Sequence, residues 1–565
     1  MQIKQTLGEH IQAAFAQIGL EGPALIQGAA REEFGDYQAN GVMAAAKRAG
    51  RNPREVAADV VQALDMEGIA SQVEIAGPGF LNITLDPEFL AKTQAAKIHP
   101  ASPSQTVVTD YSAPNLAKEM HVGHLRTTII GDSVARILEA QGHQVIRQNH
   151  VGDWGTQFGM LLTYLNDTGD DSNELADLED FYRAAKTRFD EDEDFQARSR
   201  EAVVRLQAGD KDALAMWQRF IDISMSHCQE IYDRLEVTLL PEHIRGESQY
   251  NNDLPQVIND LRGQGLLTES DGAQCVFLDE FKSKKGDILP VIVQKSDGGY
   301  LYATTDLAAI RYRTGTLHAD RVLYFTDARQ ALHFRQVFAV AEAAGFNHSH
   351  ASLEHMPFGS MLGADGKPFK TRAGGVVKLA ELLDEAEQRA ATLLRANNPD
   401  LADEDVRSAS RIIGIGAVKY ADLSKNRNSD YVFDWDQMIS FEGNTAPYLQ
   451  YAYARIQSLF AKGGVDVAAL PATTVSVEEP ERRLAVTIAG FDDALQQVTE
   501  EGFPHFLCGY LYDLASRFSQ FYDHCPILQG ADDKTRTRRL VLARQTAETL
   551  QQGLALLGIG VVQRM

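Results

Sequence analysis

Apolar and polar residues alternate along this chain in three different ways, which divide it into three parts. Before about residue 100, apolar residues recur at helical spacing over 3–19 and 52–69, and two strand-like runs, 72–75 and 80–85, flank a Gly-Pro-Gly turn. From residue 105, a short apolar strand (105–109), a helix (125–141) and a second strand (145–146) predict a parallel sheet. From about residue 376, apolar positions three and four apart predict a helix bundle.

These patterns predict an α/β protein with a small α+β N-terminal domain and an all-α C-terminal bundle. We place the domains at 1–100, 105–375 and 376–565, with an acidic helical insertion near 160–245. Further strands are expected at 291–293, 300–302 and 321–325. Bundle helices are expected near 377–396, 405–423, 435–462, 480–500, 503–524 and 534–558.

Composition narrows the class of protein. The chain has 565 residues, 44% hydrophobic and 23% charged, as is ordinary for a soluble globular protein. No apolar run approaches the ~18 residues that span a bilayer, so we expect no membrane partner. The four cysteines lie far apart, which argues against a zinc knuckle and a disulfide framework and predicts a cytoplasmic protein.

The net charge argues against a simple nucleic-acid binder. Fifty-four Lys and Arg residues against 78 Asp and Glu residues give −24, whereas such a protein is expected to be basic. Any polyanion must therefore be met by local patches.

One stretch, residues 110–124, carries a pattern typical of nucleotide chemistry. It places Lys118, His121, Gly123 and His124 between the first predicted strand of the sheet and its helix, where ligands bind in open parallel sheets. The helix amides, two imidazoles and an ammonium there suit phosphate. The two histidines could instead be helix-capping residues, or a metal pair, although no nearby carboxylate or thiol completes a metal site.

The same stretch resembles the HIGH signature of class I aminoacyl-tRNA synthetases, and the longer string 112–131 resembles that of bacterial-type arginyl-tRNA synthetases. The resemblance runs over nearly the whole chain, through the strings at 34–40, 76–80, 149–158, 246–248, 306, 416–422 and 441–448. It implies a Rossmann-like catalytic domain and the attachment of L-arginine to tRNA(Arg) through an arginyl-adenylate. ATP with Mg²⁺ would be required, with no structural metal and no obligatory protein partner evident.

The resemblance also implies roles for residues around the nucleotide. ATP would be bound by Pro114, His121, Gly123 and His124, and the catalytic residues would be Lys118, His121, His124, Lys370 and Arg372. The second class I signature departs from its usual form, because Ala373 stands where fuller versions carry a lysine. Lys118 would make up the lost charge, since stabilising the leaving pyrophosphate needs a cation from either loop. A solvated basic loop without a catalytic role is the alternative for Lys367, Lys370 and Arg372.

The arginine pocket is expected to hold carboxylates, because a guanidinium is always charged and donates in a fork. By the resemblance, Glu247, Tyr302 and Asp306 face the guanidinium, while Asn115 and Gln330 hold the α-amino end. Asp306 could instead be an N-cap residue.

The RNA contacts implied by the resemblance lie in the outer parts. Phe80 and Asn82 would meet a D-loop base, and Tyr522 and Met565 would lie near the anticodon. The bundle also offers Tyr448, Tyr451, Tyr453, Arg455, Phe521 and Arg564, although most tyrosines in a bundle are core or half-buried.

Three other functions remain open on the sequence. A glutamyl or glutaminyl enzyme is disfavoured by the carboxylates at 247 and 306, and a non-catalytic paralogue by the presence of Lys118, His121 and His124. A small adenylate-forming ligase would suit the negative charge, yet it would not need the N-terminal domain or the bundle.

Overall fold

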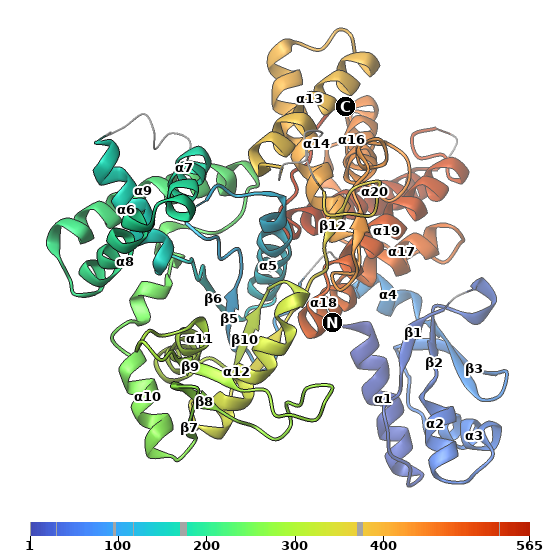
Figure 1. Cartoon of the computed structure of the whole chain (residues 1–565). Coiled ribbons are helices and arrows are strands. Elements are labelled where there is room, and N and C mark those ends of the chain that lie inside the picture. Colours follow the sequence, from blue (N-terminus) through green and yellow to red (C-terminus); the bar gives the residue numbers. More distant parts are fainter. Residues whose placement is uncertain are drawn as a thin grey trace.

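The structure is a computed structural model that describes residues 2–29, 31–93, 98–116, 118–169, 178–369, 377–529 and 532–565. Figure 1 shows the N-terminal part beside the helical C-terminal part, with the parallel sheet and its helical insertion on the other side. In the described part of the chain, no helix is both long and apolar enough to cross a membrane.

The N-terminal part is a four-stranded antiparallel sheet covered by helices, with strand order β1-β2-β4-β3. Its elements are α1 (Ile3–Gln17), β1 (Ile26–Gly28), β2 (Tyr37–Ala39), α2 (Gly41–Arg48), α3 (Pro53–Ala63), β3 (Ala70–Ala76), β4 (Phe80–Leu85) and α4 (Pro87–Thr93). The strands over 72–75 and 80–85 are confirmed. The helix expected over 52–69 is shorter, because Leu64 is already extended after α3.

The central parallel sheet is also confirmed. Its order is β11-β10-β5-β6, with every neighbouring pair parallel. The strands are β5 (Thr106–Asp110), β6 (Gln144–Gln148), β10 (Arg321–Tyr324) and β11 (Ser352–His355), and α5 (Val122–Ala140) joins β5 to β6. Valines 107 and 108 of β5 are buried on opposite faces, as expected for a strand covered on both sides.

Two excursions leave this sheet. The first is helical, with α6 (Thr156–Thr168), α7 (Leu178–Glu191), α8 (Glu193–Gln207) and α9 (Lys211–Arg234). The second contains α10 (Leu254–Gly263) and a separate antiparallel sheet of β7 (Leu267–Ser270), β8 (Ala273–Val276) and β9 (Val291–Gln294). α11 (Tyr302–Arg311) and α12 (Ala331–Ala343) follow. The strand expected at 300–302 is wrong: Tyr300 alone bridges to Gln294, and Tyr302 begins a helix.

The C-terminal part is helical, as expected. It contains α13 (Leu379–Asn397), α14 (Asp403–Leu423), α15 (Trp435–Met438), α16 (Ala446–Gly463), α17 (Glu481–Ala489), α18 (Phe491–Glu501), α19 (His505–His524) and α20 (Asp533–Leu556). The short strands β12 (Met361–Leu362) and β13 (Tyr431–Val432) pair in parallel with each other.

Two expected helices of this part are in fact interrupted. The helix expected over 435–462 breaks before Thr445, whose side chain caps α16 with Pro447 in its first turn. Proline lacks the amide that an unbroken helix needs, so it suits a helix start. The helix expected over 480–500 divides at Gly490 into α17 and α18.

Candidate active site

The loop between β5 and α5 turns sharply at the carboxyl end of the parallel sheet. Ser112 and Ala113 both have left-handed backbone angles, with φ of 72° and 45°, which are costly for residues other than glycine. The Ser112 amide donates to Thr127 Oγ1 at 3.0 Å, and the Ala113 amide donates to Asn149 Oδ1 at 2.9 Å. A strained loop that neighbouring side chains hold in place is a candidate for function.

His121 and His124 lie together where this loop enters α5, with ring centroids 4.1 Å apart. His121 Nδ1 accepts from the Gly123 amide at 3.0 Å, and His124 Nδ1 accepts from the His121 amide at 3.1 Å. The histidines therefore do cap the helix, as one interpretation of the sequence held. Because Nδ1 accepts, each neutral ring carries its proton on Nε2. Capping thus leaves each histidine one N–H donor for a ligand.

Both imidazoles favour their neutral form. Burial, and then the neighbouring His121, lower the pKa of His124 to about 3. Burial, and then the charge of Lys118, lower the pKa of His121. The histidines can therefore donate to phosphate, but the positive charge at this end of the sheet has to come from a lysine or an arginine.

In the first signature, Lys118 brings such a charge. Its Nζ lies 4.6 Å from the ring centroid of Tyr182 in α7 of the helical insertion. In the second signature, the Lys367 amide donates to Asp365 Oδ1 at 3.1 Å in an exposed turn. Lys370 and Arg372 lie outside the described residues, so their predicted catalytic roles remain predictions.

Glu247 supplies a half-buried carboxyl group close to this loop. It begins the 3₁₀ turn η4 (Glu247–Tyr250), and its amide donates to the Val151 carbonyl at 3.1 Å. Burial, and then the charges of Asp306 and Asp153, raise the pKa of Glu247 to about 8. An entering cation would favour its ionised form, so the site suits a guanidinium.

Asp306 and Tyr302 meet at a histidine that the sequence analysis did not single out. Asp306 Oδ2 lies 2.6 Å from His333 Nε2, and the Tyr302 ring packs edge-on against His333 with centroids 4.8 Å apart. The N-cap alternative for Asp306 is wrong, because α11 begins at Tyr302 after Leu301. Tyr302 is 63% exposed, so it forms the rim of the site.

The remaining predicted contacts come from neighbouring segments. Pro114 and Asn115 lie on the strained loop, where the Pro114 carbonyl accepts from the Gly152 amide at 3.0 Å. The Asn115 amide exchanges hydrogen bonds of 3.2 and 3.0 Å with Gln157 of α6. Gln330 ends the short turn η6 (Ala328–Gln330) after β10 and is the N-cap residue of α12.

Comparison with protein-family models shows which family the chain belongs to. The family model described as tRNA synthetases class I (R), catalytic domain, matches residues 87–435. The arginyl tRNA synthetase N terminal domain matches residues 1–85, and the DALR anticodon binding domain matches residues 449–565. The chain belongs to the arginyl-tRNA synthetase family. The exact domain boundaries expected from the sequence stay a prediction.

Individual arginyl-tRNA synthetases match this chain over its full length. Proteins named arginine–tRNA ligase from Marinomonas sp. (strain MWYL1) and Pseudomonas syringae pv. syringae (strain B728a) are 55% and 56% identical, with 100% of both chains covered. The crystal structure of arginyl-tRNA synthetase from Plasmodium falciparum matches at 29% identity with a TM-score of 0.87, over 100% of this chain and 99% of that one. The Thermus thermophilus arginyl-tRNA synthetase, 24% identical with a TM-score of 0.86 and 100% of both chains covered, has the same fold.

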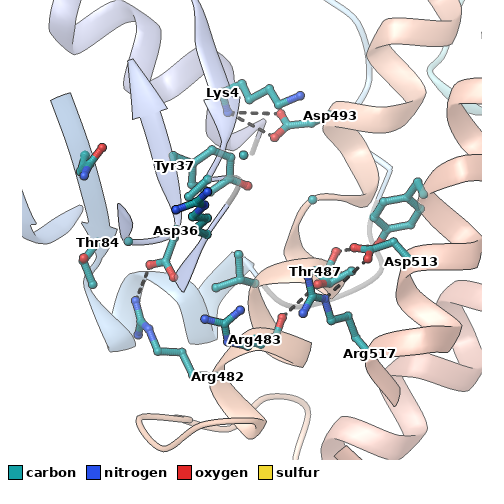
Figure 2. A pocket seen from close by; sticks show the side chains of 18 of the residues that line it. Lys4, Asp36, Tyr37, Thr84, Arg482, Arg483, Thr487, Asp493, Asp513 and Arg517 are labelled. Carbon is teal, nitrogen blue, oxygen red and sulfur yellow. Dashed lines mark hydrogen bonds and ion pairs between the residues drawn. The ribbon is translucent and has the colours of Figure 1, made fainter. Parts of the chain in front are cut away.

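Of the two N-terminal residues expected to meet RNA, Asn82 lies at a junction with the bundle. A cavity of about 570 Å³ lies there and is lined from both sides. Figure 2 shows Asp36 paired with Arg482 of α17, and Asp493 of α18 accepting from the Lys4 amide. Asn82 lines this cavity, is only 6% exposed and accepts from Gln38 Nε2 at 2.8 Å. Phe80, at the start of the same strand, is half-buried.

The C-terminal residues expected to meet RNA, Tyr522 and Met565, are both half-buried. Tyr522 is half-buried, and the Arg455 guanidinium lies 4.1 Å from its ring centroid. Met565 packs on a small cluster formed by Ala390, Leu394 and Ile413 of α13 and α14.

Other aromatic residues named from the sequence lie deeper or further out. Tyr453 and Phe521 are core residues, whereas Tyr451 is exposed.

Sequence reasoning missed Asp153, Tyr182 and His333 at this site. His333 could have been found from its spacing, because it follows Gln330 by three residues and so shares its helix face. Tyr182 carries no such signal, because its place over Lys118 depends on how the insertion packs.

Proposed function

We propose that this protein attaches L-arginine to tRNA(Arg) in an ATP-dependent reaction that passes through an arginyl-adenylate and releases AMP and pyrophosphate. The proposal is supported above all by the full-length identity of 55% to arginine–tRNA ligases. The two signature histidines support it as well, since each has an Nε2–H donor left for a ligand.

In the first step, the carboxylate of arginine attacks the α-phosphorus of ATP, and the bond to pyrophosphate breaks. His121 and His124 donate to phosphate oxygens from Nε2, and Lys118 offsets the charge that develops on pyrophosphate. The attacking group belongs to the substrate, so the step needs no side-chain nucleophile, and positioning and electrostatics supply the catalysis. Lys370 and Arg372 are proposed to assist from the second signature.

Recognition of arginine rests on the acidic side of the site. Glu247 and Asp306 hold the guanidinium, with Tyr302 at the rim, while Asn115 and Gln330 hold the α-amino end. Mg²⁺ would enter with the ATP phosphates. Among the described residues, no three His, Cys, Asp or Glu side chains are placed to hold a metal.

In the second step, the 2′-OH of the terminal tRNA ribose takes the arginyl group from the adenylate. We propose that Phe80 and Asn82 contact the D-loop and that Tyr522 and Met565 contact the anticodon loop. The overall charge of −24 means that these contacts must be few and local. We also propose a cytoplasmic protein, because the four cysteines are all free and buried.

The test is aminoacylation of a total tRNA pool with each labelled amino acid in turn. We expect charging with arginine, none with citrulline, which is neutral, and none with glutamate or glutamine. Charging with glutamate or glutamine would refute the arginine assignment. Formation of arginyl-adenylate without transfer to any tRNA would instead favour a small adenylate-forming ligase.

A further inference from the structure

Asp153 is a buried acidic residue between the signature loop and the Glu247 turn. It follows β6 by five residues and is 5% exposed. The chain just before it pairs with the signature loop, since the Leu116 amide donates to the Gly152 carbonyl at 3.1 Å. Asp153 therefore lies next to both the nucleotide side and the arginine side of the proposed site.

The Asp153 carboxylate holds the turn that carries Glu247. Its Oδ1 accepts from the Ser248 amide at 2.8 Å, and its Oδ2 accepts from Ser248 Oγ at 2.6 Å. A Cβ built on Gly246 would lie 2.2 Å from Asp153 Oδ2. Residue 246 must therefore be glycine for the carboxylate to approach so closely. The residues on both sides of Glu247 thus pack against a single side chain.

The helical insertion fixes Asp153 from behind. Trp217 Nε1 in α9 donates to the Asp153 carbonyl at 2.8 Å, and the Trp217 ring packs edge-on against Trp154 with centroids 5.6 Å apart. A buried carboxylate lowers stability unless it is well hydrogen-bonded, and Asp153 has no part in the reaction steps proposed here. Both hydrogen bonds that its carboxylate accepts come from Ser248, the residue that follows Glu247.

We propose that Asp153 is a positioning residue for arginine recognition, which holds the Gly246–Ser248 turn so that the Glu247 carboxyl faces the guanidinium. It also adds a negative charge behind Glu247, which makes the empty pocket more favourable to a cation. This inference rests on the proposed arginine activity, and it assigns Asp153 no direct contact with substrate.

The effect of the Asp153 charge on Glu247 can be measured through the pH dependence of arginine binding. Glu247 faces Asp306 on α11 and Asp153 after β6; Asp306 in turn faces His333 on α12, and Asp153 faces His150. Removing the charge of Asp153 removes one of the two like charges that oppose ionisation of Glu247. The pH at which arginine binding is half-maximally weakened should therefore fall.

Three variants separate hydrogen bonding from charge. Asp153→Asn keeps the volume and an oxygen to accept from the Ser248 amide, but it loses the charge. Asp153→Ala loses both hydrogen bonds as well, and Ser248→Ala loses one bond and keeps the charge. Asp436→Asn, at a side chain that is 99% exposed on α15, is the matched control. The readouts are the KM for arginine and for ATP in pyrophosphate exchange with tRNA present, and arginine binding by calorimetry from pH 6 to 8.

For Asp153→Ala we expect the arginine KM to rise about tenfold or more, with the ATP KM within about twofold of wild type. For Asp153→Asn we expect the midpoint of the pH dependence to fall by about half a pH unit or more. Ser248→Ala should raise the arginine KM less than Asp153→Ala and leave the midpoint in place. Asp436→Asn should match wild type in every readout.

Two results would overturn the proposal. One is an unchanged arginine KM and midpoint in both Asp153 variants. The other is an equal rise of the arginine and ATP KM values together with a lowered melting temperature, which would give Asp153 only a structural role. If wild type itself fails to use arginine, the proposed function fails instead, so the two failures are distinguishable.

Discussion

Glu247 should make arginine binding depend on pH in the physiological range. Its carboxyl group has a pKa of about 8 in the empty protein, so at pH 7 only about one molecule in ten carries the charge that a guanidinium needs. Bound arginine stabilises the ionised form, so the proton must leave as arginine enters. Arginine should therefore bind more tightly as the pH rises from 6 toward 8, and more weakly as it falls.

The magnitude follows from the same pKa. If only the ionised form binds, the apparent dissociation constant is multiplied by one plus ten raised to the difference between the pKa and the pH. That factor is about 100 at pH 6 and about 2 at pH 8, so the apparent affinity should change by about 50-fold. At pH 7, calorimetry in buffers of different ionisation enthalpy should detect close to one proton released per arginine bound.

Glu247→Gln is the control that isolates this group. A glutamine keeps the size of the side chain and removes the titration, so the variant should lose this part of the pH dependence. At pH 8 its arginine KM should be about 100-fold or more above wild type, because a desolvated guanidinium loses its carboxylate. At pH 6 the difference between the two proteins should be about 50-fold smaller than at pH 8. A wild-type KM that is constant from pH 6 to 8, or a variant that runs parallel to wild type, would refute the reasoning.

Four further outcomes are expected. Lys118→Met should lower the rate of adenylate formation by about 100-fold while arginine binding stays near normal, because the variant removes a cation needed mainly in the transition state. If the variant keeps near-normal ATP–pyrophosphate exchange, the second signature must supply the catalytic cation instead. Lys419 is fully buried, and its Nζ lies 2.6 Å from the carbonyl oxygens of Leu235 and Gly558. Burial lowers the pKa of Lys419 from 10.5 to about 8. Its charged form therefore costs about 3 kcal/mol below pH 8, a cost that fades as the pH rises toward 10.5. Urea unfolding should show wild type gaining stability relative to Lys419→Met across that window, and equal slopes with pH would contradict this. Removal of Met565 should impair aminoacylation and leave the circular dichroism spectrum unchanged, and full activity would remove the anticodon role of the C-terminus. Exchange of pyrophosphate with arginine should require tRNA, tested with tRNA whose 3′ ribose is oxidised, and robust exchange without tRNA would contradict it.

The sequence predicts elements well where one pattern governs them. The strands β4, β5 and β10 follow directly from apolar runs bounded by turns, and the signature helix follows from its spacing. The expected helix boundaries are wrong where helix capping determines where a helix begins. The 435–462 segment keeps a helical pattern, yet the Thr445 cap and Pro447 divide it, and a count of apolar positions does not weigh such local chemistry.

The predicted site shows a different limit of sequence-based prediction. Glu247 and Asp306 are far apart in the chain, and family resemblance alone brings them together before a structure exists. What the sequence lacks is the support around them. Asp153 gives no pattern of its own, because its role comes from two hydrogen bonds to Ser248 and a close approach to Gly246. Such contacts depend on tertiary packing and cannot be found from spacing.

The buried contacts of α5 limit where tRNA could act on the proposed site. At its start the helix carries the two signature histidines, and one turn later Arg126, 2% exposed, pairs with Asp422 of α14 at 3.0 Å. Breaking a buried pair of this kind costs about 3–5 kcal/mol. The signature helix and α14 should therefore move as one body. Any ordering of the site by RNA would then come from segments that this pair does not hold, such as the exposed turn at 363–367 and the insertion helix that places Tyr182 beside Lys118.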